Sequence, residues 1–221
     1  MSLRLLALTD IHGHTSYLNN IAEQVGKVDA VIVAGDIGSY DLNLNNFEKI
    51  LMLLIDIFGT KELFYVPGNC DPPAALSYSK LGTNIHGRVA QLHEYVIGGI
   101  GGSTYTPFHT PLEFSEEEIQ RLLSALLPYK PQLLISHVPP YATRLDRVRS
   151  GLHVGSRALR EFLERCKTVL LCICGHVHES PGIDTLGSVT LVNPGPAAHG
   201  RYALIELTPG QVLVKLAHAS S

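Results

Sequence analysis

Near its amino end the chain reads LRLLALTDIH over residues 3–12, an apolar run that ends in a carboxylate and an imidazole. The run from Leu3 to Leu8 has the length and aliphatic content of a strand buried on both faces. Two side chains that can bind metal, Asp10 and His12, follow it directly. Ligands of α/β proteins bind at the carboxyl ends of such strands, so this segment predicts both a core strand and a functional site.

The same pattern returns twice further along the chain. Apolar runs at Ala30 to Ala34 and Leu63 to Val66 are followed by Asp36 and Asn69. Between the three runs, apolar residues recur at helical spacing, at Tyr17, Leu18, Ile21, Ala22 and Val25 and then at Phe47, Ile50, Leu51, Leu54 and Phe58. Alternating strands and helices predict an α/β fold with a largely parallel first sheet.

The remainder of the chain predicts a second set of strands and helices. Val89 to Ile97, followed by a glycine-rich segment, is typical of a hairpin, and Ser115 with Glu118 forms a capping box that opens a helix. We expect a further helix over residues 156–166 and strands over residues 132–136, 169–174, 189–192, 202–207 and 212–216. No repeat or linker interrupts the pattern, so residues 1–221 are predicted to form a single domain.

Composition excludes several classes of protein. The 221 residues carry 17 Lys and Arg against 20 Asp and Glu, and a net charge of −3 does not favour binding to a nucleic-acid backbone. The longest apolar stretch, Ile50 to Phe58, is interrupted by Asp56 and falls short of the roughly 18 residues that span a bilayer. The amino-terminal run lacks a signal-peptide cleavage site, and two of the four cysteines, Cys172 and Cys174, lie in an apolar run typical of a core. We therefore expect a cytoplasmic protein without a membrane helix or a disulfide framework.

Side chains with metal-binding capacity follow the predicted strands at five places. They are Asp10, His12, Asp36, Asn69, His137, His176 and His178. Oxygen ligands mixed with imidazole suit Mn, Fe, Zn or Co better than Ca or Mg, and one shared carboxylate could bridge two ions about 3.5–4 Å apart. Asp10 and Asp36 could instead be helix N-caps, and Asn69 could occupy a turn for its backbone alone.

In their order and context these motifs resemble the calcineurin-like metallophosphoesterase family. The resemblance runs from Asp10 to about Asn193 and rests on the strings DIH, GD, GNCD and GHVH together with His137. It implies a four-layer α/β/β/α sandwich of two mixed β-sheets flanked by helices. It also implies a first metal held by Asp10, His12 and His178, a second held by Asn69, His137 and His176, and Asp36 as the bridging ligand.

The GNCD string departs from many relatives, which have histidine where this chain has Cys70. Cysteine is a poor general acid at neutral pH, since its unperturbed pKa is about 8.5. The string resembles a branch of small prokaryotic phosphodiesterases, which favours diesters over monoesters and places Cys70 near the substrate; a merely packed thiol is the alternative. We expect Asn69 to ligate metal and hold the substrate phosphate, and Asp71 to assist catalysis by orienting a ligand.

A second substrate-proximal candidate is His153, which lies before a predicted helix in a glycine-containing loop suited to a phosphate neighbour. Arg144, Arg147 and Arg149 precede it and could hold an anion, although a solvated charged loop is the simpler interpretation. The loops at residues 71–86 and 106–114 are expected to shape the rest of the substrate site.

The resulting prediction is a metal-dependent phosphoester hydrolase, acting on a small phosphodiester through a dinuclear centre and a bridging hydroxide. Mn is the ion expected to support activity in vitro, with Fe, Zn, Co or Ni as alternatives, and the sequence leaves a homo-oligomer open. A phosphomonoesterase of the same fold and a non-catalytic metal-binding scaffold are the competing hypotheses. No motif points to nucleic acid or membrane as a partner.

Overall fold

The computed structural model describes residues 2–220 and contains two six-stranded β-sheets. The first sheet has the order β12-β11-β1-β2-β3-β4. Its strands are β1 (Leu3–Leu8), β2 (Ala30–Ala34), β3 (Leu63–Val66), β4 (Thr83–Asn84), β11 (Arg201–Thr208) and β12 (Gln211–His218). Strands β1 to β4 pair in parallel, whereas β11 and β12 add antiparallel neighbours, so the sheet is mixed.

The second sheet has the order β5-β6-β7-β8-β10-β9. Its strands are β5 (Arg88–Leu92), β6 (Tyr95–Ile100), β7 (Leu133–Ser136), β8 (Leu171–Ile173), β9 (Gly182–Leu186) and β10 (Val189–Asn193). The four central strands are parallel, and β5 and β9 are antiparallel edges. The hairpin predicted around residues 89–97 is confirmed as β5 and β6.

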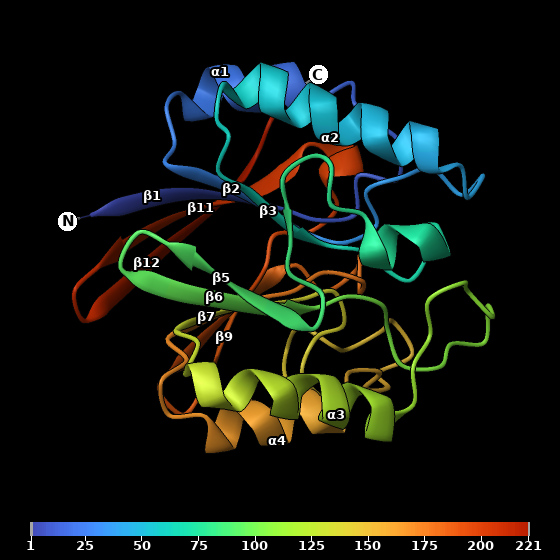
Figure 1. The fold of residues 1–221 in the computed structure, drawn as a ribbon, viewed down its shortest axis with the longest axis vertical. Coiled ribbons are helices and arrows are strands. Elements are labelled where there is room, and N and C mark those ends of the chain that lie inside the picture. Colours follow the sequence, from blue (N-terminus) through green and yellow to red (C-terminus); the bar gives the residue numbers. More distant parts are fainter. Residues whose placement is uncertain (1, 221) are drawn as a thin grey trace.

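The two sheets stack face to face, and helices cover both outer faces (Figure 1). Helices α1 (Leu18–Val25) and α2 (Leu44–Phe58) cover the first sheet, and α3 (Glu116–Leu126) and α4 (Arg157–Arg165) cover the second. Short 3-10 turns are η1 (Pro73–Ser77), η2 (Leu127–Tyr129) and η3 (Ala197–His199). The predicted four-layer sandwich of two mixed sheets is thereby confirmed.

The layering follows from the strands being apolar on both faces. In β1, Leu5 and Ala7 lie in the core between the sheets, and Leu6 and Leu8 lie in the core beneath α1 and α2. Successive side chains of a strand point to opposite faces, so each buried strand contributes to two cores at once. This arrangement leaves the strand ends, rather than the sheet faces, open to solvent and ligands.

The positions of the helix N-caps test the alternative that Asp10 and Asp36 cap helices. Helix α1 begins after Tyr17 and α2 after Asn43, whose side chain accepts the Asn45 N–H, so neither Asp10 nor Asp36 is a helix N-cap. The capping box that opens α3 is confirmed. Strands β4 and β9 were not predicted: β4 is two residues long, and β9 is a half-exposed edge without an apolar run.

All four cysteines carry free thiols, and Cys166, Cys172 and Cys174 are buried, which confirms the core interpretation. Between residues 2 and 220, no helix combines the length and the apolar character that crossing a membrane requires. Residues 1 and 221 lie outside the described part of the chain, and a single domain over 1–221 stays a prediction.

Candidate metal centre

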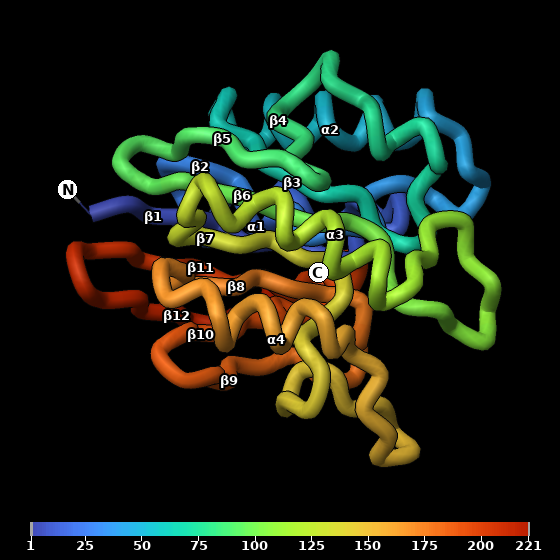
Figure 2. The backbone as a smooth tube through the Cα atoms, turned by 60° about the horizontal axis from the view of Figure 1, so that its bottom comes forward, coloured from blue at the N-terminus to red at the C-terminus, as the bar shows by residue number. Residues whose placement is uncertain are grey.

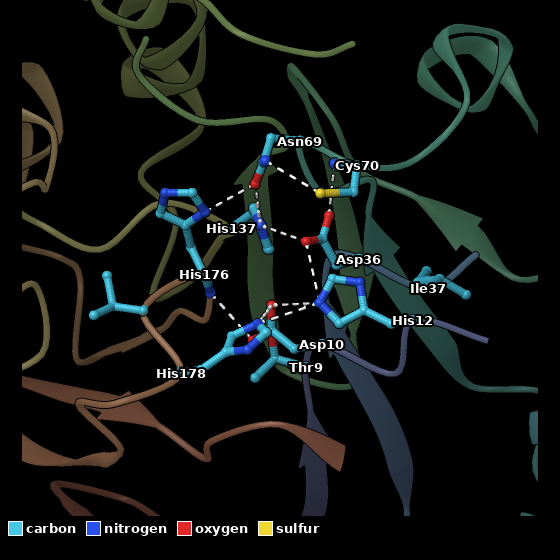
Figure 3. A network of polar contacts seen from close by, with 12 residues as sticks. Thr9, Asp10, His12, Asp36, Ile37, Asn69, Cys70, His137, His176 and His178 are labelled. Carbon is cyan, nitrogen blue, oxygen red and sulfur yellow. Dashed lines mark hydrogen bonds and ion pairs between the residues drawn. The ribbon is translucent and has the colours of Figure 1, made fainter. Parts of the chain in front are cut away.

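The seven predicted ligands lie together at the carboxyl ends of five strands (Figure 3). The first sheet contributes four of them, after β1, β2 and β3, and the second sheet contributes three, after β7 and β8. The site therefore lies where the open ends of the two stacked sheets meet, which is the usual ligand position in such folds.

Four of these residues adopt a left-handed backbone conformation that side chains other than glycine rarely adopt. They are Asp10, His12, Asp36 and His176, with φ between 48° and 68°. The turns are supported by hydrogen bonds between neighbouring strand ends, because the Asp10 N–H donates to the Gly35 carbonyl at 3.0 Å and the His12 N–H donates to the Asp36 carbonyl at 2.8 Å. Such conformations persist only where surrounding contacts hold them, and they concentrate at functional sites.

One group of ligand atoms surrounds His12. Its Nε2 atom lies 3.2 Å from His178 Nε2, 3.8 Å from Asp10 Oδ1 and 3.5 Å from Asp36 Oδ2. Asp10 Oδ1 in turn lies 3.2 Å from His178 Nε2. These four side chains can surround a single cation with two imidazoles and two carboxylates, one of the donor sets that transition metals favour.

The second group surrounds the Asn69 side-chain oxygen. Asn69 Oδ1 lies 2.8 Å from both His137 Nε2 and His176 Nδ1. Asp36 Oδ2 lies 3.5 Å from His137 Nε2 and also 3.5 Å from His12 Nε2, so this carboxylate borders both groups. The opposite nitrogen of His137 faces the Ala34 carbonyl at 2.7 Å and must donate to it, which leaves Nε2 as the atom free to act as a ligand.

Two buried atoms of the first group form no hydrogen bond: Asp10 Oδ1 and His12 Nδ1. Desolvating a carboxylate oxygen without a well-aligned partner is costly in a protein interior. A cation at this position would satisfy Asp10 Oδ1, and the mixed imidazole, carboxylate and amide donors match the chemistry of a transition-metal site. The side chains at this site are therefore suited to hold the metal ions that the family resemblance implies.

Protons neutralise part of this site in the metal-free protein. Burial disfavours a charged His137, but the adjacent Asp36 carboxylate outweighs burial and raises the pKa of His137 to about 9. Despite burial, the same pairing holds the pKa of Asp36 below its usual range. Burial, with the nearby His137 charge, lowers the pKa of His176 to about 4. One imidazolium proton thus occupies a position at which a cation would bind, and cation binding must displace it.

Asp71 lies behind the ligands rather than beside the open cavity. It is fully buried, and its carboxylate accepts the backbone N–H groups of Ile37, Gly38 and Gly68 at 3.1, 2.7 and 2.7 Å. Burial, with the charge of Asp36, raises the pKa of Asp71 to about 7. Its contacts tie the segment after β2 to the segment after β3, and its predicted catalytic role stays a prediction.

Five of the seven ligands line an open cavity of about 680 Å³, whereas Asp10 and His137 are buried and do not line it. Cys70 lines this cavity, and so do residues from the loop at 106–114, whereas the loop at 71–86 contributes none; the place of Cys70 next to substrate stays a prediction. Sequence reasoning missed Tyr40, whose ring stacks on His12 with centroids 4.7 Å apart, and Thr110, whose hydroxyl accepts from Asn69 Nδ2 at 2.9 Å. No motif marks either residue; only its loop position after a ligand strand could have drawn attention to Tyr40.

His153 is not brought to the ligands. Its Nδ1 lies 2.7 Å from the buried Asp146 carboxylate, and the ring lines a separate shallow cavity with Tyr141 and Arg157. Of the three loop arginines, Arg149 borders a cavity beside the metal ligands. The placement of His153 next to substrate therefore stays a prediction without support from the ligand geometry.

Comparisons with known proteins identify the family and the fold. The family model for calcineurin-like phosphoesterases matches residues 3–180. A Methanocaldococcus jannaschii protein of uncharacterized function is 34% identical over 205 residues, covering 90% of this chain and 91% of that protein. Protein TT1561 of Thermus thermophilus has a similar fold, with a TM-score of 0.75, 19% identity and coverage of 100% of both chains. A dimetal phosphatase from Danio rerio has a TM-score of 0.68 at 14% identity, covering 99% of this chain and 96% of that one. The chain belongs to the calcineurin-like phosphoesterase family, and this membership implies a metal-dependent phosphoester hydrolase.

Proposed function

We propose that this protein hydrolyses small phosphodiesters at a dinuclear metal centre. The observation that carries the proposal is the convergence of seven ligand side chains into two groups that share Asp36, with five of the seven lining a cavity open to solvent. Asp10, His12 and His178 would hold one cation, Asn69, His137 and His176 would hold the other, and Asp36 would bridge them. When bound, two divalent cations supply an acidified bridging water as nucleophile and draw negative charge from the phosphoryl oxygens.

The side chains prepare the site for an anionic substrate. Asp10 and Asp36 are the two carboxylates among the seven ligands, so two dications would exceed their charge and leave the floor of the cavity positive. Asn69 presents its oxygen to His137 and His176, while its NH₂ group donates to Thr110. That orientation fixes which end of the amide faces the cations and keeps the ligand in place without metal.

Cys70 supports a preference for diesters over monoesters. The thiol lines the cavity next to Asn69, with its sulfur 3.4 Å from Asn69 Nδ2. Burial and the neighbouring Asp36 charge raise the pKa of the Cys70 thiol above its usual range. A neutral thiol of this kind neither protonates a departing oxygen at neutral pH nor acts as a thiolate ligand, so substrates with poor leaving groups gain no acid catalysis from it. We propose on this basis that the chain belongs to the small phosphodiesterase branch with the GNCD string.

The first test is hydrolysis of bis(p-nitrophenyl) phosphate and of p-nitrophenyl phosphate by purified protein that has been stripped of metal and reloaded with Mn. We expect turnover of the diester that depends on metal, with about two metal ions per chain by elemental analysis. Faster turnover of the monoester would favour the phosphomonoesterase hypothesis. Bound metal without turnover of either ester would favour the non-catalytic metal-binding scaffold.

A second test changes Cys70 to histidine. We expect Cys70→His to raise kcat/KM for phenyl phosphate, which has the poorer leaving group, relative to p-nitrophenyl phosphate, because an imidazole can protonate a leaving oxygen at neutral pH. Cys166→Ser is the control, since this thiol is buried at the end of α4 and does not line the cavity. An unchanged ratio of phenyl phosphate to p-nitrophenyl phosphate kcat/KM in Cys70→His would contradict the proposed effect of the thiol.

A further inference from the structure

A second cavity, of about 580 Å³, adjoins the metal centre. His176, Glu179 and Phe108 line both cavities, so the two form a continuous depression. Residues of the loops at 104–108 and 148–154 line the second cavity. In Figure 2 both loops extend beyond the strands, the first in green at the right and the second in gold at the lower right. Its volume is within the range of about 300–1,000 Å³ that small-molecule sites occupy.

The walls of this cavity are tied to one another by hydrogen bonds. The Thr104 hydroxyl donates to the Val154 carbonyl at 3.3 Å and joins the two loops. The Arg149 N–H donates to Glu179 Oε1 at 3.1 Å, which joins the second loop to the segment that carries His176 and His178. The cavity is therefore formed before any ligand arrives, a property that limits the entropy lost on binding.

Apolar side chains are concentrated around this depression. Among residues 2–220, nine large hydrophobic side chains are exposed, and five of them line one or both cavities: Tyr40, Leu42, Tyr105, Phe108 and Leu152. Tyr105, Phe108 and Leu152 are 71%, 81% and 66% exposed. Apolar surface gathered at one place on a protein is typical of a binding site, whereas scattered apolar side chains are not.

The chemistry of the walls indicates the ligand. The second cavity has one cationic and one anionic lining residue, Arg149 and Glu179, so it does not select for net charge. The rings of Tyr105 and Phe108 offer exposed faces on which a planar group can stack. A phosphoester bound at the metal centre carries its organic groups on the ester oxygens, and the adjoining cavity is where one such group can avoid water.

We propose that this cavity binds an aromatic ester group of the substrate while the phosphate lies at the metal centre. The inference rests on the proposed function, since it presumes that the neighbouring centre binds phosphate. It narrows the substrate class to phosphoesters that carry a neutral, ring-bearing substituent. Aryl and nucleoside substituents share this chemistry.

The test is calorimetric titration of the Mn-loaded protein with three phosphonates that cannot be hydrolysed: methylphosphonate, phenylphosphonate and hexylphosphonate. We expect phenylphosphonate to bind about tenfold more tightly than methylphosphonate. Failure of all three to bind would contradict the proposed function itself. Equal affinities for the methyl and phenyl compounds would contradict only the proposal that the second cavity binds an aromatic group. Tighter binding of hexylphosphonate than of phenylphosphonate would show that the cavity prefers an alkyl chain to a ring.

Variants locate the effect. Leu152→Ser and Phe108→Ser change exposed side chains on the cavity wall and should reduce the ratio of phenyl to methyl affinity toward one. Leu213→Ser, a matched change of an exposed leucine on β12, should leave the ratio unchanged. If both wall variants keep the phenyl-to-methyl affinity ratio of the unaltered protein, the aromatic group binds outside this cavity. A nucleoside 5′-phosphonate that binds more tightly than phenylphosphonate would identify the ring as a nucleobase, and weaker binding would identify a simple aryl group.

Discussion

Asp36 is the residue on which the two ligand groups depend, because its Oδ2 atom faces both His12 and His137 while its Oδ1 accepts the Cys70 N–H at 2.8 Å. We expect Asp36→Asn to bind fewer than two metal ions and to lose about a hundredfold or more in turnover. The amide keeps the volume of the carboxylate and can still accept the Cys70 N–H, so the protein should remain folded. Elemental analysis and diester hydrolysis measure the two effects.

Asp56→Asn is the control for this change, since Asp56 is an exposed residue of α2 away from the cavity. It should retain metal and turnover. An Asp36→Asn protein that binds two metal ions per chain and turns over at the normal rate would contradict the bridging role.

His86 illustrates a different kind of titrating residue, one outside the metal centre. Its Nδ1 accepts the Gly101 N–H at 2.8 Å and its ring stacks on Phe114, so the folded protein requires the neutral imidazole. Burial, with a smaller contribution from Arg88, lowers the pKa of His86 to about 4, whereas an unfolded histidine titrates near 6.5. Below pH 6.5 the unfolded chain binds the proton and the folded chain does not, so this stabilising contribution is present above pH 6.5 and is lost as the pH falls toward 4.

We expect the metal-free protein to lose on the order of 1 kcal/mol of unfolding free energy between pH 7 and pH 5 through His86 alone. Urea denaturation at several pH values, in the presence of a chelator, measures the total pH dependence. His86→Gln retains an acceptor for Gly101 but does not titrate, so its stability should fall less steeply with acidification. Identical slopes for the two proteins would show that His86 does not contribute.

Residue types and their order were predictable from the chain, because Asp, Asn and His directly after apolar runs are a chemical pattern. The left-handed backbone at Asp10, His12 and Asp36 was not predictable, since contacts from neighbouring strand ends impose it against the local preference of these residues. Tyr40 and Thr110 were missed for a similar reason: each meets a ligand through the folding of a loop, at a position that no spacing rule marks.

At the scale of elements, the turn after β3 has to pass close to the turn after β2. A Cβ atom added to Gly68 would lie 2.0 Å from Asp36 Oδ1 and 2.2 Å from the Asp36 backbone nitrogen. Because the added Cβ would collide with the backbone of Asp36 as well as with its side chain, the two turns would have to move apart. We expect Gly68→Ala to weaken metal binding by about tenfold or more and to destabilise the fold by about 1–3 kcal/mol. Competition with a fluorescent chelator and urea denaturation measure these effects.

Gly182→Ala, in the edge strand β9, is the matched control because its added Cβ would approach only the Leu145 side chain, at 3.3 Å. Its metal affinity should equal that of the unaltered protein. Normal metal affinity in Gly68→Ala would mean that the two turns can separate without displacing Asp36.

Elements with strong apolar periodicity were predicted to within a few residues. The strands β1, β2 and β3 have the predicted bounds, and the helix predicted over 156–166 is α4 (Arg157–Arg165). Strand order in the second sheet had no such signal, since β10 pairs with β8 and leaves the earlier β9 at the edge. Half-exposed edge strands bury few side chains, so their sequences lack the apolar pattern that would predict them.

At the scale of the whole molecule, the candidate ligands come from both of the sheets that pack against each other through the apolar core. Asp10, His12, Asp36 and Asn69 come from the first sheet, and His137, His176 and His178 come from the second. The four-layer architecture was expected from the family resemblance rather than from periodicity, because apolar runs predict buried strands without saying which sheet each one joins. The candidate ligand set depends on that assembly, so we expect metal to bind the folded protein and not the unfolded chain.

Metal binding should therefore stabilise the whole fold. A ligand that binds only the folded state adds about 2.7 kcal/mol per site at a hundred times its Kd, so two sites would add about 5 kcal/mol. For a chain of 221 residues each kcal/mol raises Tm by about 2–4 °C, which predicts a rise of roughly 10–20 °C on adding Mn to stripped protein. Acidification should reduce this rise, because cation binding displaces the proton that Asp36 holds on His137. Differential scanning calorimetry at pH 6 and pH 8, with and without Mn, measures the rise in Tm and its dependence on pH. In Asp36→Asn, where the shared ligand is weakened, we expect a smaller rise in Tm. If Mn does not change the Tm of the unaltered protein, the proposal that metal links the two sheets is contradicted.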